Sequence, residues 1–490
     1  MNVAVVHYHL RPGGVTTVVN HCIRALRPYQ VNLAVLAGER SVYPLVDDTT
    51  VRKIPGLGYQ NSVEQNVSPD KLAADMCDAA KSAFGGAMPD VWHIHNHGLG
   101  KNAALPGAVR QLAEEGCSLL LHIHDFAEDG RPANYRHLVK NAAHGDHATL
   151  HRLLYPTADH IRYAVLNSRD HEFLRYAGVP EPHVGLLQNP VDIGTQTEIE
   201  KSAKSMEADR LFLYPVRAIR RKNLGEFLLL SALAPPGDRF AVTLSPRNPA
   251  AQPVYEDWVA FARASRLPVD FELGKGNGTD LASLMARAYA TVTTSVAEGF
   301  GMAFLEPWLC DRTVYGRKLP DVTQQFADAG IALPETYTEL CIPPEWLDTS
   351  SLKQEITESW KKMMQAYGRD ADRRCTEAVL NSMLGSDCLD FGRLSERHQQ
   401  RAIRRIIDSE TARMRLRAYR VGTKPINKAV LRANKTIVER DFNLDKYGRN
   451  LYAIYRSLMN QRVSRVECAS GEDLLDQFLA PQRFSLLRTC

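Results

Sequence analysis

The sequence predicts an α/β protein built from two consecutive halves, each with a mostly parallel sheet. Short apolar runs alternate with helical patterns over the first 190 residues, and strands separated by helices form β-α-β units. A polar, weakly periodic stretch over 193–210 interrupts this series. The alternation then begins again at Leu211, without a fixed short repeat. A length of 490 residues is sufficient for such a chain.

The individual elements follow from the same patterns. In the first half we expect strands over Val3–Val6, Val31–Ala37, Asp90–His95, Ser118–His124 and Tyr163–Asn167, with helices over Val15–Leu26 and from the cap residue Ser168 to Gly178. In the second half we expect strands over Leu211–Val216, Phe240–Leu244, Val269–Leu273 and Thr291–Thr294, with helices over Leu224–Leu233, Tyr255–Ala264 and about 280–289.

The predicted organisation has four parts. An N-terminal domain covers 1–192, and a linker covers 193–210. A second domain covers 211–440, and its part from about 320 to 440 is a helical, basic insertion. A C-terminal segment, 441–490, completes the chain.

The composition is that of an ordinary globular protein, with 44% apolar and 24% charged residues. A formal net charge of +4 excludes a disordered polyelectrolyte and gives no argument for nucleic-acid binding. We expect no membrane-spanning helix and no signal peptide. The nine cysteines are odd in number and lack a C-x-x-C pair, so we expect free thiols in a reducing cytoplasm.

The stretch from Thr294 to Glu306 carries the strongest chemical signal. A strand ends at Thr294, a loop with Gly299 and Gly301 follows, and a helix is expected from Gly301. Ligands of open α/β sheets bind beyond the carboxyl ends of the strands, and a helix N-terminus favours phosphate. Glu298 in the loop and Glu306, about one turn into the helix, can accept hydrogen bonds from sugar hydroxyls. The alternative, a loop with two solvated glutamates, is disfavoured by the strand-loop-helix context.

A second cluster follows the strand Leu211–Val216. Arg217, Arg220, Arg221 and Lys222 place four cations within six residues at the carboxyl end of that strand. Such a group suits a diphosphate. An exposed basic loop is the alternative interpretation.

A glycine pair and two sets of histidines form the third group. Gly13-Gly14 lies between the first strand and a helix, as in a phosphate-binding loop, although the pair alone is weak evidence. Histidines alternate near the ends of two predicted strands, so each set is expected to share one face: His93, His95 and His97, and His122 and His124. A zinc site requires three or four convergent ligands, and we favour a polar, ligand-facing role over zinc.

The order and spacing of these motifs resemble the retaining glycosyltransferase family four, whose members have the GT-B fold. The matching segments are Arg11 to Val15, Asp90 to His95, His122 to Asp125 (with His122 where Thr is usual), Val165 to Ser168, Gln188 to Asp192, the pair Arg217 and Lys222, Glu298 to Glu306, and Phe442 to Leu458.

The resemblance implies two Rossmann-like domains that face a cleft, with a C-terminal helix crossing back to the first domain. It implies metal-independent transfer of a sugar from a nucleotide-sugar substrate, with retention by front-side attack, in which the leaving phosphate accepts the proton of the acceptor. No metal or other cofactor is expected. The acceptor, which is a sugar, a glycerate-type compound or a lipid-linked molecule, stays open.

The resemblance also assigns the site. Arg217 and Lys222 would hold the donor diphosphate and stabilise its charge as it leaves. Glu306 would bind the ribose hydroxyls, Glu298 would orient the donor sugar, and His124 would lie near the reacting carbon. The amides of the two glycine loops would add contacts to the donor: Gly13, Gly14, Gly299, Phe300, Gly301 and Met302.

The sequence departs from the family after Glu306. Pro307 follows at once, and Asp311 stands where the family has Gly. About 120 residues without a close match come next, for which an acceptor-binding lid, the contact surface of a homodimer and a membrane-surface patch are the interpretations. Residues 401–440 have a net charge of +9, which fits a solvated face, an anionic membrane or lipid-linked acceptor, or an acidic partner.

Two other functions stay open at this point. One is a phosphate-dependent disaccharide phosphorylase on the same fold. The other is an inactive module that binds a sugar or a nucleotide.

Overall fold

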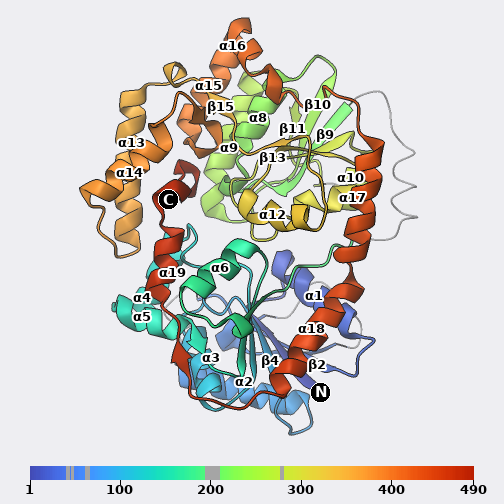
Figure 1. Ribbon diagram of the computed structural model, residues 1–490, viewed down its shortest axis with the longest axis vertical. Coiled ribbons are helices and arrows are strands. Elements are labelled where there is room, and N and C mark those ends of the chain that lie inside the picture. The colour runs from blue at the N-terminus through green and yellow to red at the C-terminus, as the bar shows by residue number, and fades with distance from the viewer. Residues whose placement is uncertain (40–44, 46–48, 61–66, 194–209, 276–280, 490) are drawn as a thin grey trace. The chain divides into compact units, whose positions relative to one another are not determined.

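The computed structural model describes residues 1–39, 45, 49–60, 67–193, 210–275 and 281–489 of the chain (Figure 1). Two compact units emerge. The first takes residues 1–190, 364–369 and 442–480, and the second takes 191–363, 370–441 and 481 onward. Most of the expected linker, 194–209, lies outside the described residues.

The first unit is built on a seven-stranded sheet in the order β3-β2-β1-β4-β5-β7-β8, and every pair in it is parallel. The sheet forms because the strands are apolar along their whole length and are covered on both faces. Its strands are β1 Asn2–His7, β2 Asn32–Ala37, β3 Thr50–Lys53, β4 Val91–His95, β5 Leu119–Ile123, β7 Ile161–Val165 and β8 Val184–Leu186. The strand order reverses between β1 and β4, which makes this the switch point of the sheet.

The helices and small strands of the first unit connect and cover this sheet. They are α1 Gly14–Leu26, α2 Pro69–Ala83, α3 Leu105–Glu114, α4 Pro132–Asn141, α5 His147–Leu154, α6 Ser168–Tyr176, α18 Leu444–Met459 and α19 Gly471–Phe478, with the antiparallel pair β6 Pro156–Thr157 and β17 Glu467–Cys468. The predicted cap of α6 was wrong by one residue. Asn167 is the N-cap, and its side chain accepts a hydrogen bond from the backbone N–H of Asp170.

The C-terminal helix α18 packs against α1 in the first unit (Figure 1). Leu451, Tyr455 and Leu458 are fully buried in the core that α1 shares with the sheet. The helices approach closely because Gly448 has no side chain. A Cβ atom at this position would overlap the backbone oxygen of Ala25.

The second unit contains a six-stranded sheet in the order β11-β10-β9-β12-β13-β14, also parallel throughout. Its strands are β9 Arg210–Arg217, β10 Asp238–Leu244, β11 Val269–Asp270, β12 Ala290–Thr293, β13 Val314–Arg317 and β14 Thr336–Tyr337. β13 and β14 lie beyond Thr294, where the predicted series of strands ended. β11 is shorter than the predicted strand Val269–Leu273. The switch point of this sheet lies between β9 and β12.

Helices make up most of the remainder of the second unit, as the pattern predicted for 350–440. They are α8 Leu224–Leu233, α9 Gln252–Ala264, α10 Leu281–Arg287, α11 Glu306–Leu309, α12 Pro320–Asp328, α13 Thr349–Ala366 (whose last residues belong to the first unit), α14 Arg373–Leu384, α15 Glu396–Asp408, α16 Glu410–Arg415 and α17 Lys428–Asp441. None of the described helices combines the length and the apolar character needed to cross a membrane.

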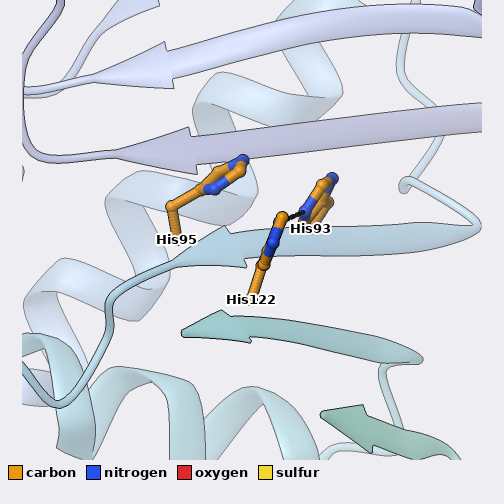
Figure 2. A group of neighbouring side chains, drawn as sticks. All are labelled: His93, His95 and His122. Atoms are coloured by element: carbon orange, nitrogen blue, oxygen red, sulfur yellow. Dashed lines mark hydrogen bonds between the residues drawn. The ribbon is translucent and has the colours of Figure 1, made fainter. Parts of the chain in front are cut away.

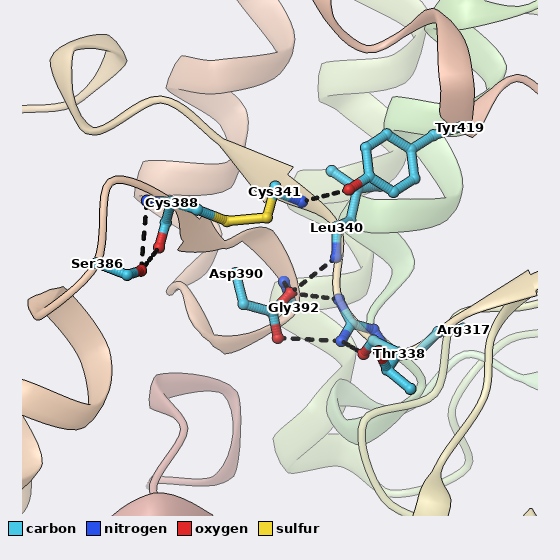
Figure 3. Close-up of a disulfide and its surroundings, with 9 residues drawn as sticks. All are labelled: Arg317, Thr338, Leu340, Cys341, Ser386, Cys388, Asp390, Gly392 and Tyr419. Atoms are coloured by element: carbon cyan, nitrogen blue, oxygen red, sulfur yellow. Dashed lines mark hydrogen bonds and ion pairs between the residues drawn. A yellow bond between two sulfur atoms is a disulfide. The ribbon is translucent and has the colours of Figure 1, made fainter.

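The expectation of free thiols was wrong for two cysteines. Cys341, in β15 Cys341–Ile342, forms a disulfide with Cys388, which directly precedes β16 Leu389–Asp390; the two strands pair antiparallel (Figure 3). The two cysteines are 47 residues apart, so no short spacing motif marks them. Six other cysteines are free among the described residues.

A buried ion-pair network joins this disulfide region to the sheet (Figure 3). Arg317, at the end of β13, donates hydrogen bonds to Asp390 of β16 at 2.7 and 3.0 Å. It also donates to Glu226 of α8 at 2.7 Å, and the Glu226 side chain is fully buried. Burial raises the pKa of Glu226, and Arg317 opposes this shift. The network therefore fixes the insertion to the first helix after β9.

Candidate active site

Two loops of the second unit come together at its switch point. One leaves β9 through a 3-10 turn at Arg220–Lys222, and the other leaves β12 and runs from Thr294 to Gly301. The adjacency of β9 and β12 brings them into contact, as the two motifs require. The backbone N–H of Val296 donates to the carbonyl of Arg221 at 2.9 Å.

Glu298 is held by two cations from the other loop. Lys222 Nζ donates to Glu298 Oε1, and Arg221 Nη1 donates to Glu298 Oε2 at 3.0 Å. Arg221 also donates to the carbonyl of Ala297 at 2.6 Å. The Lys222 and Glu298 side chains are 13% and 9% exposed, so both charges are largely removed from water. Arg221 was not among the predicted site residues, although it lies in the basic run that predicted them.

A polar network behind the loops fixes Lys222. Tyr214 Oη donates to the carbonyl of Lys222 at 2.8 Å and is hydrogen-bonded to Ser295 Oγ at 2.8 Å. Thr294 Oγ1 donates to the carbonyls of Lys222 and Asn223, each at 3.1 Å. Asn223 adopts a left-handed conformation with φ of 53°, so the chain turns sharply into α8 directly after Lys222. Thr294 and Ser295 lie in the stretch that predicted Glu298, but the sequence pattern assigned a bracing role to none of these residues.

Opposed forces set the protonation of the buried pair. Burial alone would raise the pKa of Glu298, but Lys222 and Arg221 lower that pKa to about 2. Burial lowers the pKa of Lys222, and Glu298 opposes this change. Glu298 is therefore ionised at neutral pH.

Glu306 lies in a different electrostatic environment. Burial raises the pKa of its carboxyl group to about 7, and Lys222 offsets only part of this shift. No described residue donates a hydrogen bond to this carboxyl group in the structure. Glu306 thus has a pKa near neutral pH and carboxyl oxygens that can still accept hydrogen bonds, close to Lys222. These properties suit a ligand with hydroxyl groups.

The remaining cations of the run diverge. Arg217 donates to the carbonyl of Ser245 at 2.9 Å. Burial and the nearby cation Arg247 lower the pKa of the Arg217 guanidinium. Arg220 turns away and pairs with Glu396 at 2.6 Å, which gives it a structural role. Of the four cations, Arg221 and Lys222 meet Glu298, and Arg217 lies at the strand end.

The predicted helix from Gly301 was wrong in form. A 3-10 turn occupies Met302–Phe304, and the four-residue helix α11 begins at Glu306. Glu306 is therefore the first residue of α11 rather than one turn into a helix. Gly301 has a φ of 87°, and a Cβ there would lie 2.8 Å from a Val322 methyl group, so the turn requires glycine. Phe300 packs edge-on against Phe326, with ring centroids 5.5 Å apart, and anchors the loop that contains Gly299.

Both departures after Glu306 fit this geometry. Pro307 is the second residue of α11, where a helix needs no N–H donor. Asp311 has a φ of 55°, the left-handed conformation that glycine favours. Lys435 holds the Asp311 carboxylate at 3.0 Å. The backbone path through this segment thus accommodates both changes.

The predicted glycine loop and histidines lie in the first unit. Gly13 precedes α1, which begins at Gly14, and a Cβ on Gly14 would meet no atom within 4 Å. His124 follows β5 and is 6% exposed, and its backbone N–H donates to Asn96 Oδ1 at 2.7 Å. Burial lowers the pKa of His124 to about 4, with Asp125 opposing, so this imidazole is neutral at pH 7.

His93, His95 and His122 form a buried group of imidazoles (Figure 2), and the His124 ring packs against His95 and His122. His93 is hydrogen-bonded to Tyr455 of α18 at 2.8 Å and to His122 at 3.1 Å, and His95 is hydrogen-bonded to His124 at 2.8 Å. Burial, with a contribution from His124, lowers the pKa of His93 to about 3. The stack therefore consists of neutral rings that connect the sheet to α18.

The same stack bears on a metal site. One nitrogen each of His93, His95 and His122 lies within 4.8 Å of the others, which is a geometry that could hold an ion. Both nitrogens of His93 already have hydrogen-bond partners, Tyr455 and His122. Hydrogen bonds thus account for much of the arrangement. The predicted shared face was wrong for His97, which lies beyond the end of β4 and is hydrogen-bonded to the carbonyl of Leu154 at 2.7 Å.

Comparison with known proteins identifies the class. No family model matches the chain. It is 24% identical over 413 residues to mannosylglucosyl-3-phosphoglycerate synthase from Petrotoga mobilis, covering 80% of this chain and 78% of the relative. It shares 14% identity with the sucrose-phosphate synthase structure from Thermosynechococcus elongatus, with a TM-score of 0.54, covering 94% and 99% of the two chains. It shares 14% with Anabaena HepE, solved in complex with UDP-glucose, with a TM-score of 0.53, covering 93% and 100%.

The two parallel sheets and these neighbours define a GT-B protein, which confirms the predicted fold. The relatives named above include glycosyltransferases, and the chain is accordingly a glycosyltransferase enzyme. The resemblance that the motifs indicated is confirmed at that level.

Proposed function

We propose that the chain transfers a sugar from a nucleotide diphosphate sugar to an acceptor hydroxyl, with retention of configuration and without a metal ion. The observation that carries this proposal is the pairing of Lys222 with Glu298 beside the carboxyl group of Glu306, which accepts no hydrogen bond from any described residue. Lys222 and Glu298 lie in the two loops at the switch point of the second unit, and Glu306 begins the helix α11 that follows one of them. Sheets of this α/β kind bind nucleotides at such a point.

Each residue then has a chemical task. Arg217 and Lys222 bind the donor diphosphate and stabilise its negative charge as the glycosidic bond breaks. Glu306 accepts hydrogen bonds from the two ribose hydroxyls. Glu298 contacts the donor sugar while it keeps Lys222 in position. The amides of Gly301 and Met302 add dipoles toward the phosphates.

The proposed mechanism needs no added cation. Positive charge comes from three side chains at the end of β9 and in the loop after it: Arg217, Arg221 and Lys222. In other transferases a divalent ion supplies this charge. The acceptor attacks from the side that the leaving diphosphate vacates, and a phosphate oxygen takes the acceptor proton. His124, which the family resemblance assigns to the donor sugar, has an imidazole that is neutral at pH 7, so its ring carries no charge that would oppose this transfer.

The comparisons support a uridine nucleotide as the first donor to examine. HepE was solved with UDP-glucose, and its fold matches this chain over 93% of the length. The name of the Petrotoga mobilis relative describes a product that contains a mannosyl group, a glucosyl group and 3-phosphoglycerate. UDP-glucose, GDP-mannose and ADP-glucose are therefore the donors to compare.

The test is thermal stabilisation by UDP, GDP and ADP, measured with the wild-type chain and with Arg217→Ala. We expect one nucleoside diphosphate to raise the melting temperature and Arg217→Ala to remove most of that rise. Slow donor hydrolysis that Glu298→Ala abolishes separates an enzyme from an inactive binding protein. Activity that persists in EDTA supports the metal-free mechanism. If no nucleotide shifts the melting temperature, the donor assignment is wrong.

The proposal also covers the location of the chain and its partners. We propose a cytoplasmic location, because six of the described cysteines are free thiols, which persist in a reducing compartment. The Cys341–Cys388 disulfide would persist better in an oxidising compartment. We also propose peripheral contact with an anionic membrane, because the side chains of Arg401 and Arg405 on α15 are exposed. Homodimer formation stays a prediction that light scattering can check.

A further inference from the structure

Lys101 lies beside the switch point of the first unit. It belongs to the loop that leaves β4, next to the loop that leaves β1 and carries Gly13. The switch point of an open sheet is where a ligand is expected. Sequence reasoning did not single out Lys101, because one lysine in a loop forms no motif.

The loop around Lys101 is rigidly held. The carbonyl of Lys101 accepts a hydrogen bond from the backbone N–H of Gln60 at 3.0 Å. The buried Asn102 side chain donates to the carbonyls of Gly56 and Gly58 at 2.7 and 2.9 Å. Asn134 of α4 donates to the carbonyl of Leu99 at 2.9 Å. Two separate segments, 56–60 and α4, therefore fix the backbone on both sides of Lys101, so its side chain starts from a preorganised position.

The charge of Lys101 has no carboxylate partner among the described residues. Its ammonium lies 5.6 Å from the centre of the Tyr59 ring, and the side chain is partly buried. The neighbouring cation Arg131 is neutralised by Asp125, with which it forms an ion pair. Burial and the positive charge of Arg131 lower the pKa of Lys101, so both disfavour its protonated form.

The other described groups near Lys101 do not supply a free negative charge to it. Arg11 is paired with Glu39 at 2.7 Å. His137 is hydrogen-bonded to Gln60 at 3.2 Å, and burial together with Lys101 lowers the pKa of its imidazole. The described surroundings of Lys101 thus contain paired ions and neutral rings. The positive charge of Lys101 is left to attract an anion from solution.

We propose that Lys101 binds an anionic group, a phosphate or a carboxylate, on the acceptor of the sugar transfer. The inference rests on the proposed function, and it adds the chemical class of the acceptor. The two phosphates of the donor already have Arg217 and Lys222 in the second unit, so the anion at Lys101 is a different one. Tyr59, against which the ammonium packs, supplies a ring face on which the carbon skeleton of a small acceptor can rest.

The first test measures binding without turnover. Acylation of lysines by sulfo-N-hydroxysuccinimide acetate is followed by mass spectrometry, with and without inorganic phosphate, 3-phosphoglycerate, glucose 6-phosphate or glucuronate. We expect at least one of these anions to slow the modification of Lys101 by threefold or more. The exposed Lys81 on α2 serves as the internal control and keeps its rate. Glucose and glycerol are expected to protect neither lysine.

The second test uses turnover. With the donor identified above, the rates for 3-phosphoglycerate and glucose 6-phosphate are compared with those for glycerol and glucose. We expect the anionic member of a pair to react faster, and Lys101→Gln to raise its KM by 10-fold or more. The KM for the donor is expected to change by less than twofold, and Lys81→Gln is expected to behave as wild type in both respects.

The two tests separate the failures. Anion protection of Lys101 without any nucleotide binding supports the anion site and overturns the donor assignment. Nucleotide stabilisation without protection of Lys101 by any of the four anions overturns the anion site and leaves the proposed function standing. Protection by phosphates alone or by glucuronate alone identifies the anion as phosphate or carboxylate. Equal rates for neutral and anionic acceptors also overturn the proposal.

Discussion

Lys222 and Glu298 form an ion pair with each other. Lys222 donates to one carboxylate oxygen of Glu298 while Arg221 donates to the other, and both members of the first pair are largely buried. A donor diphosphate therefore competes with Glu298 for Lys222. The carboxylate keeps the ammonium in place, and it also lowers the net charge that the diphosphate meets.

Glu298→Gln is expected to separate these two effects. The amide keeps the shape of the side chain but releases Lys222 from a charged partner, so UDP should bind several-fold more tightly. Transfer should fall by roughly 10²–10³-fold, because a group that contacts the reacting sugar is lost. Calorimetry gives the first quantity and initial rates the second. Glu272→Gln, which removes the half-buried partner of the exposed Lys275, is the matched control. Weaker UDP binding by Glu298→Gln would contradict the competition.

Donor affinity is expected to depend on pH through Glu306. The pKa of this carboxyl group is raised to about 7, so below pH 7 it is protonated and loses acceptor capacity. UDP-glucose has no group that titrates near pH 7, and its KM should rise roughly 3–10-fold from pH 8 to pH 6. Glu306→Gln should show a high KM with little slope over that range. Equal slopes for the two proteins would exclude Glu306 as the titrating group.

The same raised pKa predicts a change in stability. A carboxyl group with a raised folded-state pKa stabilises the fold below its unfolded pKa, and this contribution is lost as pH rises through about 7. Glu306→Gln removes the cost of ionisation, so it should raise the free energy of unfolding at pH 8 by about 1–3 kcal/mol. At pH 4 the two proteins should be equally stable. Urea denaturation at both pH values measures the difference.

Much of the fold could be predicted because its determinants are local. Parallel strands such as Val3–Val6 are buried on both faces and read as apolar runs, and the helix Leu224–Leu233 was predicted at its observed bounds. The error at α6 was small because Asn167 and Ser168 are both good caps, and the backbone path selected Asn167.

The rest depends on contacts that the sequence does not display. Cys341 and Cys388 meet only because β15 and β16 pair across a long helical segment. Glu306 could be chosen from its motif, but the 3-10 turn before it follows from the packing of Phe304 and Phe300. Lys101 has no motif, and its significance comes from the charges that surround it in space.

Loss of Arg317 should be far more harmful than loss of a surface arginine. Its removal leaves Glu226 as a buried charge without its cation, so Arg317→Met should lower the free energy of unfolding by about 3–5 kcal/mol. The double variant Arg317→Met, Glu226→Leu should recover only part of this loss, since α8 then carries no uncompensated charge while Asp390 still lacks its cation. Arg239→Met, which breaks an exposed pair with Asp270, should cost less than about 1 kcal/mol. Equal losses for Arg317 and Arg239 would contradict the network.

Gly448→Ala tests whether the C-terminal helix needs its close approach to α1. The added methyl group would overlap the carbonyl of Ala25, so α18 must shift away from the core that holds Leu451 and Tyr455. The expected loss is about 1–3 kcal/mol in unfolding free energy. Gly185→Ala in β8 is the matched control, because a methyl group there meets no atom within 4 Å. A displaced α18 also moves Tyr455 away from His93, so hydrogen exchange should increase in α18 and at the buried imidazole stack together. If Gly448→Ala is as stable as Gly185→Ala, the two helices do not depend on this contact.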